Sequence, residues 1–140
     1  MIALIRISGI VNMNIRMEET LSRLRLRRKF ACVVIKETPE ALGMIKKIRN
    51  FVAFGKINEE TLVALLKARG KKLEDSKGKI SDPEKIAKEI MAGKNLETLG
   101  VKPFFRLHPA RGGIKSKLHY PRGVLGDHKE DINKLIMKML

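Results

Sequence analysis

Side chains able to do acid–base, nucleophilic or metal chemistry are few in this chain, and their spacing builds no catalytic site. Of three histidines, only His128 has a possible metal ligand within one helical turn, Asp131, and two groups do not make a metal site. His108 and His119 lie in a segment without periodicity, where a contact to a phosphate or a base is a better expectation than catalysis. The single cysteine, Cys32, lies in a short apolar run and is expected to pack in the core. The sequence therefore predicts no catalytic residue and no metal ligand.

Loops that bind nucleotides are also missing from the sequence. No GxxxxGK[ST] motif follows an expected strand, and GxGxxG occurs nowhere. Acidic residues stand in the first turns of expected helices, where they interact favourably with the helix dipole: Glu18, Glu19, Glu59 and Glu60. We therefore expect no cofactor, no small-molecule substrate and no enzymatic activity.

Positive charge is the strongest chemical signal in the sequence. The 140 residues include 30 Lys and Arg but only 15 Asp and Glu, which gives a formal net charge of +15 at pH 7. So large an excess favours a polyanionic partner such as nucleic acid. Aromatic residues make up only 4% of the chain, with no Trp, so we expect phosphate and shape contacts to outweigh base reading.

The cations concentrate in two clusters that ordinary solvation does not explain. The first places five basic residues within positions 23–29, at the expected end of a helix, where the helix dipole needs only one or two. The second lies between Glu97 and Asp127, an interval without any carboxylate. The side chains that we expect to bind RNA are Arg23, Arg25, Arg27, Arg28, Lys29, Arg106, His108, Arg111, Lys115, Lys117 and Arg122.

Residues 109–126 form the centre of the second cluster and show neither helical nor strand periodicity. This segment contains four glycines and two prolines and has little apolar surface to bury. We therefore expect it to be unstructured in the free protein and to become ordered as it neutralises phosphates. The alternative is an ordinary flexible surface loop.

Strands and helices must position these clusters. Ile2–Ser8 alternates as a half-buried strand with Arg6 on its polar face, and the continuous apolar run at 30–35 predicts a strand buried on both faces. Asn14 and Thr38 are expected to cap the helices that follow these two strands.

The helix capped by Thr38 is predicted to carry one apolar stripe as far as Val52 and to end at Gly55. Three further helices and one strand are expected: helices at 59–69, from the capping signal at 81–84 to 93, and from 127 onward, and a strand at 102–107. The order is therefore β-α-β-α, inserted helices, β, a long loop and α.

No apolar run approaches the roughly 18 residues that a membrane-spanning helix needs, and the first residues lack the cleavage site typical of a signal peptide. One cysteine excludes a disulfide framework and fits a reducing compartment. We therefore expect a cytoplasmic protein that does not associate with membranes.

Two stretches of the sequence resemble a known family. TPEALGMIKKIRNFVAFGKINEETLVALLKARG, at residues 38–70, and KPFFRLHPARGGIK, at 102–115, are similar to the archaeal form of the large-subunit ribosomal protein family numbered thirty, whose eukaryotic members carry the number seven. Residues 2–30 resemble the same family's first strand and helix. The archaeal type is favoured because a basic N-terminal extension of the eukaryotic kind is missing.

This resemblance implies a structural component of the large ribosomal subunit, docked on large-subunit ribosomal RNA beside other ribosomal proteins. It also implies an α+β fold with a small β-α-β-α-β, two-layer, ferredoxin-like core, whose three-stranded sheet has the first strand in the middle. We expect this core at 1–57 with 101–108, a helical insertion at 58–100, the RNA-binding loop at 109–126 and the C-terminal helix at 127–140. A free-standing RNA-binding regulatory protein is the alternative.

Overall fold

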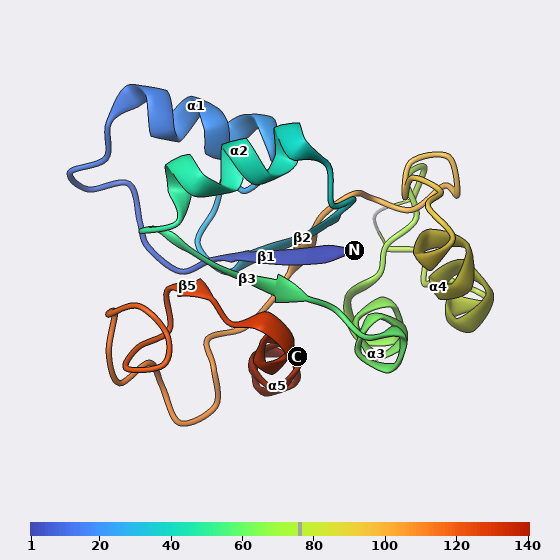
Figure 1. Ribbon diagram of the computed structural model, residues 1–140. Helices are drawn as coiled ribbons and strands as arrows, with labels where there is room; N and C mark the ends of the chain where they lie inside the picture. Colours follow the sequence, from blue (N-terminus) through green and yellow to red (C-terminus); the bar gives the residue numbers. More distant parts are fainter. Residues whose placement is uncertain (76) are drawn as a thin grey trace.

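Five strands pair in one sheet in the order β4-β2-β1-β3-β5 (Figure 1). The computed structural model describes residues 1–75 and 77–140. The strands are β1 (Ile2–Arg6), β2 (Ala31–Ile35), β3 (Val52–Lys56), β4 (Phe105–Arg106) and β5 (Gly126–Asp127). β1 is the central strand and pairs antiparallel with β2 and β3, whereas β5 pairs parallel with β3.

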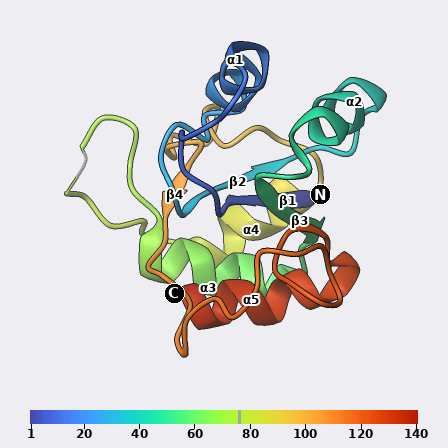
Figure 2. The same ribbon diagram turned by 90° about the vertical axis from the view of Figure 1, so that its left-hand side faces the viewer.

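Helices cover both faces of the sheet, so the molecule has three layers (Figures 1 and 2). The helices are α1 (Ile15–Arg23), α2 (Pro39–Ile48), α3 (Glu59–Arg69), α4 (Pro83–Met91), the 3-10 turn η1 (Lys129–Asp131) and α5 (Ile132–Met139). α1 and α2 lie side by side over one face, and α3 and α5 lie under the other. α4 packs against α3, away from the sheet.

The β1-α1-β2-α2-β3 unit confirms the expected α+β class with the first strand in the middle. The sheet is wider than the three strands that were expected, because β4 and β5, of two residues each, extend its two edges. α3 and α5 add a third layer, and the leucines of α3 share one hydrophobic cluster with strand residues such as Cys32 and Val34.

β1 is buried over its whole length, and the prediction of a half-buried strand is wrong. Ala3 and Ile5 belong to the hydrophobic cluster under the sheet, whereas Ile2 and Leu4 belong to the cluster below α1 and α2. The polar member, Arg6, is itself only 2% exposed. A central strand in a sheet covered on both sides has no face toward solvent. Alternate residues of β1 therefore face two different hydrophobic clusters rather than core and solvent.

β3 replaces the last part of the predicted second helix. α2 ends at Ile48, and Val52 begins a strand instead of continuing the helical stripe. A side chain added at Gly55 would meet the carbonyl oxygen of Lys129 and lie 2.9 Å from Cβ of Ile132. Gly55 therefore does not end a helix, but allows η1 and α5 to cross the strand closely.

Side chains cap the first two helices, as expected. The side chains of Asn14 and Thr38 accept hydrogen bonds from the first turns of α1 and α2, with donor–acceptor distances of 3.1 and 3.2 Å. Asn58 and Asp82 precede α3 and α4 without a capping side-chain hydrogen bond. The expected strand at 102–107 is reduced to β4, at the edge of the sheet.

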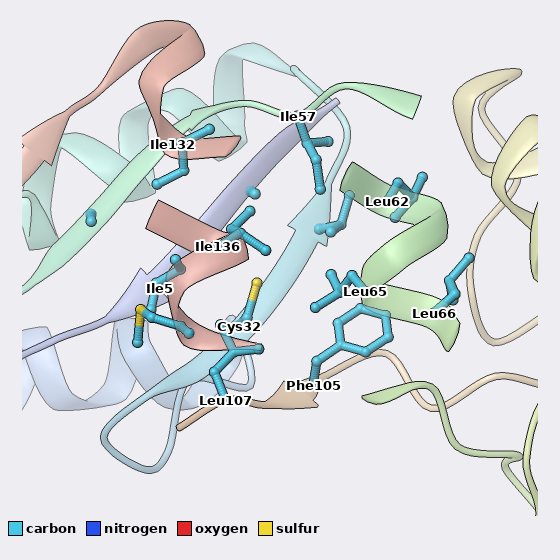
Figure 3. Close-up of a cluster of buried hydrophobic side chains, with 14 of the residues drawn as sticks. Ile5, Cys32, Ile57, Leu62, Leu65, Leu66, Phe105, Leu107, Ile132 and Ile136 are labelled. Atoms are coloured by element: carbon cyan, nitrogen blue, oxygen red, sulfur yellow. The ribbon is translucent and has the colours of Figure 1, made fainter. Parts of the chain in front are cut away.

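The larger hydrophobic cluster fills the space between the sheet and the helices α3 and α5 (Figure 3). Cys32 lies in it with Leu65 and Phe105 and has no exposed surface. Burial raises the pKa of the Cys32 thiol to about 12, which keeps the thiol protonated. The expected core role of Cys32 is confirmed.

Candidate RNA interface

The first basic cluster lies on the turn between α1 and β2 rather than around the end of a longer helix. α1 ends at Arg23, and the chain then turns at Arg25, whose φ of 61° is left-handed. Leu24 and Leu26 are buried beneath the turn. Because apolar and basic residues alternate here, Arg23, Arg25 and Arg27 are exposed on the outer surface.

A buried arginine holds this turn from the inside. Nη1 of Arg6 donates to the carbonyl oxygens of Leu26 and Arg27 at 2.8 and 2.9 Å, and Nε donates to the carbonyl of Ser8 at 3.1 Å. Burial lowers the pKa of the Arg6 guanidinium, but the group remains protonated at physiological pH. Arg6 is thus a positioning residue, which the alternating pattern had placed on a polar face.

The turn forms one wall of a cavity of about 500 Å³, and residues of and before β4 form the other. We call this cavity the arginine pocket; its lining includes Arg23, Arg25, Arg27, Arg28, Arg106 and Phe104. The fold thus brings together five of the predicted RNA-binding residues from two distant parts of the sequence. Among the described residues, no carboxylate lines the arginine pocket.

Neighbouring contacts distinguish the members of this cluster. Arg25 forms an ion pair with Glu97, and the described part of the chain shows no ion pair for the other four arginines of the pocket. The Arg106 guanidinium lies over the Phe104 ring, 5.7 Å from its centroid. Lys29 lies over the Phe30 ring at 5.1 Å, beside the turn.

A second basic hollow shares Phe104 and Arg106 with the arginine pocket. Its cations were not predicted: Arg69, Lys71, Lys77, Lys79 and Lys102. Residues 69–79 also contain acidic side chains, so the local composition resembles an ordinary solvated surface. The fold brings these cations beside Phe104 and Arg106, which no linear pattern of the segment indicates.

Residues 109–126, which we call the basic loop, are packed against the body of the protein, unlike the unstructured segment that was expected. Ala110 and Leu125 are buried, and the Arg111 N–H donates to the carbonyl of Lys138 in α5 at 3.0 Å. The Leu125 N–H donates within the loop to the carbonyl of Leu118 at 3.1 Å. Backbone hydrogen bonds therefore hold the loop in place, although its sequence has no hydrophobic periodicity.

Glycines in the basic loop shape its turns. Gly113 and Gly126 have left-handed φ values of 75° and 89°. A side chain at Gly126 would also lie 2.7 Å from Nδ1 of His119, whereas space around Gly113 is open for at least 4 Å. Gly126 is therefore needed for both its backbone conformation and its close packing.

Histidines anchor the basic loop rather than forming a reactive group. Nε2 of His119 lies 2.9 Å from Oδ1 of Asn50, at the end of α2. Nε2 of the buried His128 lies 2.6 Å from the carbonyl oxygen of Val124. The described residues contain no group of three His, Cys, Asp or Glu side chains that could hold a metal ion.

Tyr120 ties the basic loop to η1. Its hydroxyl donates to Oδ2 of Asp131, and its ring centroid lies 4.6 Å from that of His128. The hydrogen bond raises the pKa of Tyr120 and lowers that of Asp131. The Asp131 carboxylate also pairs with Lys134 at 2.9 Å, and this contact raises the lysine pKa.

The remaining predicted RNA-binding residues lie outside the arginine pocket. The exposed cations of the basic loop are Arg111, Lys115, Lys117 and Arg122, and exposed His108 precedes them. The loop runs from the end of β4, at one edge of the sheet, to β5, at the other edge. No described helix is long and apolar enough to cross a membrane.

Comparisons with known proteins identify the family. The model of the family described as ribosomal protein L30p/L7e matches residues 2–52. The chain is 45% identical over 151 residues to large ribosomal subunit protein uL30 of Archaeoglobus fulgidus, covering 99% of both chains. It is 38% identical to the protein of that name from Methanococcus vannielii and 34% identical to that from Methanoculleus marisnigri, each over 152 residues and 99% of this chain.

These relatives span the whole chain, including the basic loop and the helices α3 and α4 that lie outside the part matched by the family model. They confirm the resemblance carried by residues 38–70 and 102–115, and they are archaeal, as that resemblance implied. The family is one of ribosomal proteins and not of enzymes. The chain therefore belongs to the ribosomal protein L30p/L7e family.

Proposed function

We propose that this chain is a structural constituent of the large ribosomal subunit that binds large-subunit ribosomal RNA through the arginine pocket and the basic loop. It acts in the cytoplasm, within the ribosome, beside other large-subunit proteins and without a cofactor or a small-molecule substrate. Membership of the L30p/L7e family and the net charge of +15 support this proposal.

The observation that carries the RNA-binding part is the arginine pocket. Five guanidinium groups converge on about 500 Å³, and no carboxylate of the described residues lines that space. Like charges at this density repel one another unless an anion neutralises them. The planar fork of arginine matches the oxygens of a phosphate group, so an RNA backbone is a suitable partner.

The salt dependence of binding tests this proposal. If both surfaces contact RNA, about ten cations meet phosphates, and log affinity should fall with log salt with a slope of roughly −7 for single-stranded segments. The measurement is a titration of a large-subunit ribosomal RNA fragment at several salt concentrations. A slope shallower than about −2 would contradict the proposal, because the cations would then be solvated in the complex.

Sedimentation separates a ribosomal constituent from a free-standing RNA-binding regulator. We expect the protein to remain with large subunits through a high-salt wash, whereas a regulator would be released while still binding RNA. Incubation with labelled RNA provides a second control, since any turnover would indicate an enzyme.

A further inference from the structure

The arginine pocket contains a flat surface as well as positive charge. Phe104 and Arg106 both line this pocket, and the Arg106 guanidinium lies over the Phe104 ring, 5.7 Å from its centroid. Bases stack both on aromatic rings and on arginine guanidinium planes. Phe104 and Arg106 therefore offer adjacent surfaces of the two kinds that stack with a nucleobase.

The shape of the pocket favours one unstacked nucleotide over a duplex. Its volume of about 500 Å³ falls within the roughly 300–1,000 Å³ of pockets that take small ligands. The bases of a duplex are stacked on one another and cannot enter a cavity, whereas a nucleotide in a loop or bulge can be turned outward. Arg23, Arg27 and Arg28 line the same pocket as Phe104 and supply cations for the flanking phosphates of that nucleotide.

The turn that carries these arginines is held in place without RNA. Arg6 binds the carbonyl oxygens of Leu26 and Arg27 from inside the protein, and Leu24 and Leu26 fix the turn by burial. A site whose backbone is already positioned loses less entropy when a ligand binds. This property is expected of a pocket for a defined nucleotide more than of a surface that only attracts a polyanion.

We infer that the arginine pocket binds a single unpaired nucleotide of an RNA strand, with its base stacked on Phe104 and Arg106 and its phosphates on Arg23, Arg27 and Arg28. This inference rests on the proposed function and specifies the kind of RNA that this part of the surface takes. It also qualifies the expectation that the chain, poor in aromatic residues, recognises phosphates alone.

Two probes of equal charge test the inference with the full chain: hexauridylate, whose bases stack weakly on one another, and a chain of six abasic ribose phosphates. We expect hexauridylate to bind more tightly by roughly 5- to 150-fold, which is the range for stacking of one base. Phe104→Leu should remove most of that preference, and Phe104→Tyr should retain it. Phe54→Leu is the matched control, because Phe54 is also partly buried against the same cluster but does not line the pocket.

A second variant keeps the test informative if Phe104→Leu fails to fold. Arg106→Lys changes an exposed side chain and preserves the charge, so it should reduce the preference for hexauridylate without altering the salt dependence. Equal binding of both probes by the unmodified protein, or a preference that survives in both variants, would overturn the inference. The proposed function would still stand in either case if the protein bound large-subunit ribosomal RNA with a steep salt dependence, and it would fail separately if that binding were absent.

Discussion

The arginine pocket and the basic loop carry the same sign of charge at opposite edges of the sheet, but they are held in different ways. In the pocket, a buried guanidinium and two buried leucines fix a short turn, and the cations meet side chains from β4. In the loop, main-chain hydrogen bonds and the contacts of His119 and His128 fix separate points, with exposed cations between them. The pocket adds a side-chain contact, that of Arg106 with Phe104, to its fixed backbone, so we expect it to lose less rotamer freedom on binding than the exposed loop cations.

This difference means that net charge alone does not measure the contribution of a basic segment to binding. Two sets of four cations release similar numbers of counterions. The set whose cations already converge should contribute more to affinity, because it loses less conformational entropy when it binds.

Removing four cations from each surface gives the largest effect. The pocket variant carries alanine at Arg23, Arg27, Arg28 and Arg106, and the loop variant carries alanine at Arg111, Lys115, Lys117 and Arg122. Each should reduce the salt slope for large-subunit RNA by about 3 and the affinity near 0.1 M salt by roughly 10²- to 10³-fold. We expect the pocket variant to lose more, and urea unfolding should change by no more than about 0.5 kcal/mol for each surface substitution. A larger loss in the loop variant would reverse the comparison.

Replacing Arg6 removes the internal support of the arginine pocket. Arg6→Met should lower the free energy of unfolding by about 3 kcal/mol, because it leaves the buried carbonyl groups of Leu26 and Arg27 without their donor. Arg27→Met removes the same type of residue from an exposed position and should change stability by less than about 0.5 kcal/mol. Urea denaturation of both variants measures the difference, and equal stabilities would show that Arg6 does not hold the turn.

Replacing a left-handed glycine by alanine should loosen the basic loop. Gly113→Ala should cost about 1–2 kcal/mol, the usual penalty for a left-handed non-glycine residue. Gly126→Ala carries the same penalty and also meets His119, which adds about 1–3 kcal/mol for overpacking. Thermal unfolding should therefore rank Gly126→Ala as the more destabilised variant. If Gly113→Ala were equally destabilised, the close packing at β5 would not be restraining the loop.

The fourth prediction concerns the histidines near these surfaces. His108→Ala should leave stability nearly unchanged, because its side chain is exposed, and should weaken RNA binding much less than the loss of four cations does. His119→Ala removes the contact with Asn50, so hydrogen exchange at Tyr120 and Leu125 should become faster while RNA binding falls only slightly. Loss of subunit incorporation in either variant, with incorporation kept in the loop variant, would contradict the RNA-binding proposal.

The smallest effect is the pH response of the contact between the basic loop and η1. The pKa of Asp131 is lowered in the folded protein, so its stabilising contribution is complete above the unfolded value of about 3.9 and is lost as the pH falls through the lower folded value. Tyr120→Phe should raise the carboxyl pKa toward its ordinary value. An NMR titration of the Asp131 carboxyl group measures this change, and an unchanged pKa would show that Tyr120 does not bind Asp131 in solution.

Local signals were sufficient for much of the fold. Asn14 and Thr38 cap the helices that they precede, and residues 30–35 contain a buried strand, because capping groups and continuous apolar runs act over a few residues. β3 was missed since Val52 continues the helical spacing of Ile45 and Ile48, and only the crossing of η1 explains Gly55. Local periodicity carries no information about a contact between Gly55 and Lys129 of η1, which lies far later in the chain.

The candidate site shows the same limit. Both cation clusters were visible in the sequence, but the convergence of the first cluster with Arg106 depends on the pairing of β4 with β2. The supporting role of Arg6 and the anchoring of His119 on Asn50 depend on contacts between distant residues. The cations of residues 69–79 do not stand out in the sequence, because only the fold brings them beside Phe104 and Arg106.

The short edge strands have a consequence for the protein during its own synthesis. β1, β2 and β3 are complete once residue 56 has emerged, but the outer edges of β2 and β3 stay unpaired until β4 and β5 are made. At synthesis rates of about 5–20 residues per second, the outer edge of β3 waits roughly 4–14 s. An open strand edge is a template for pairing with another chain. The segment from β5 to α5 therefore completes the sheet and also ends the interval in which nascent chains can aggregate through it.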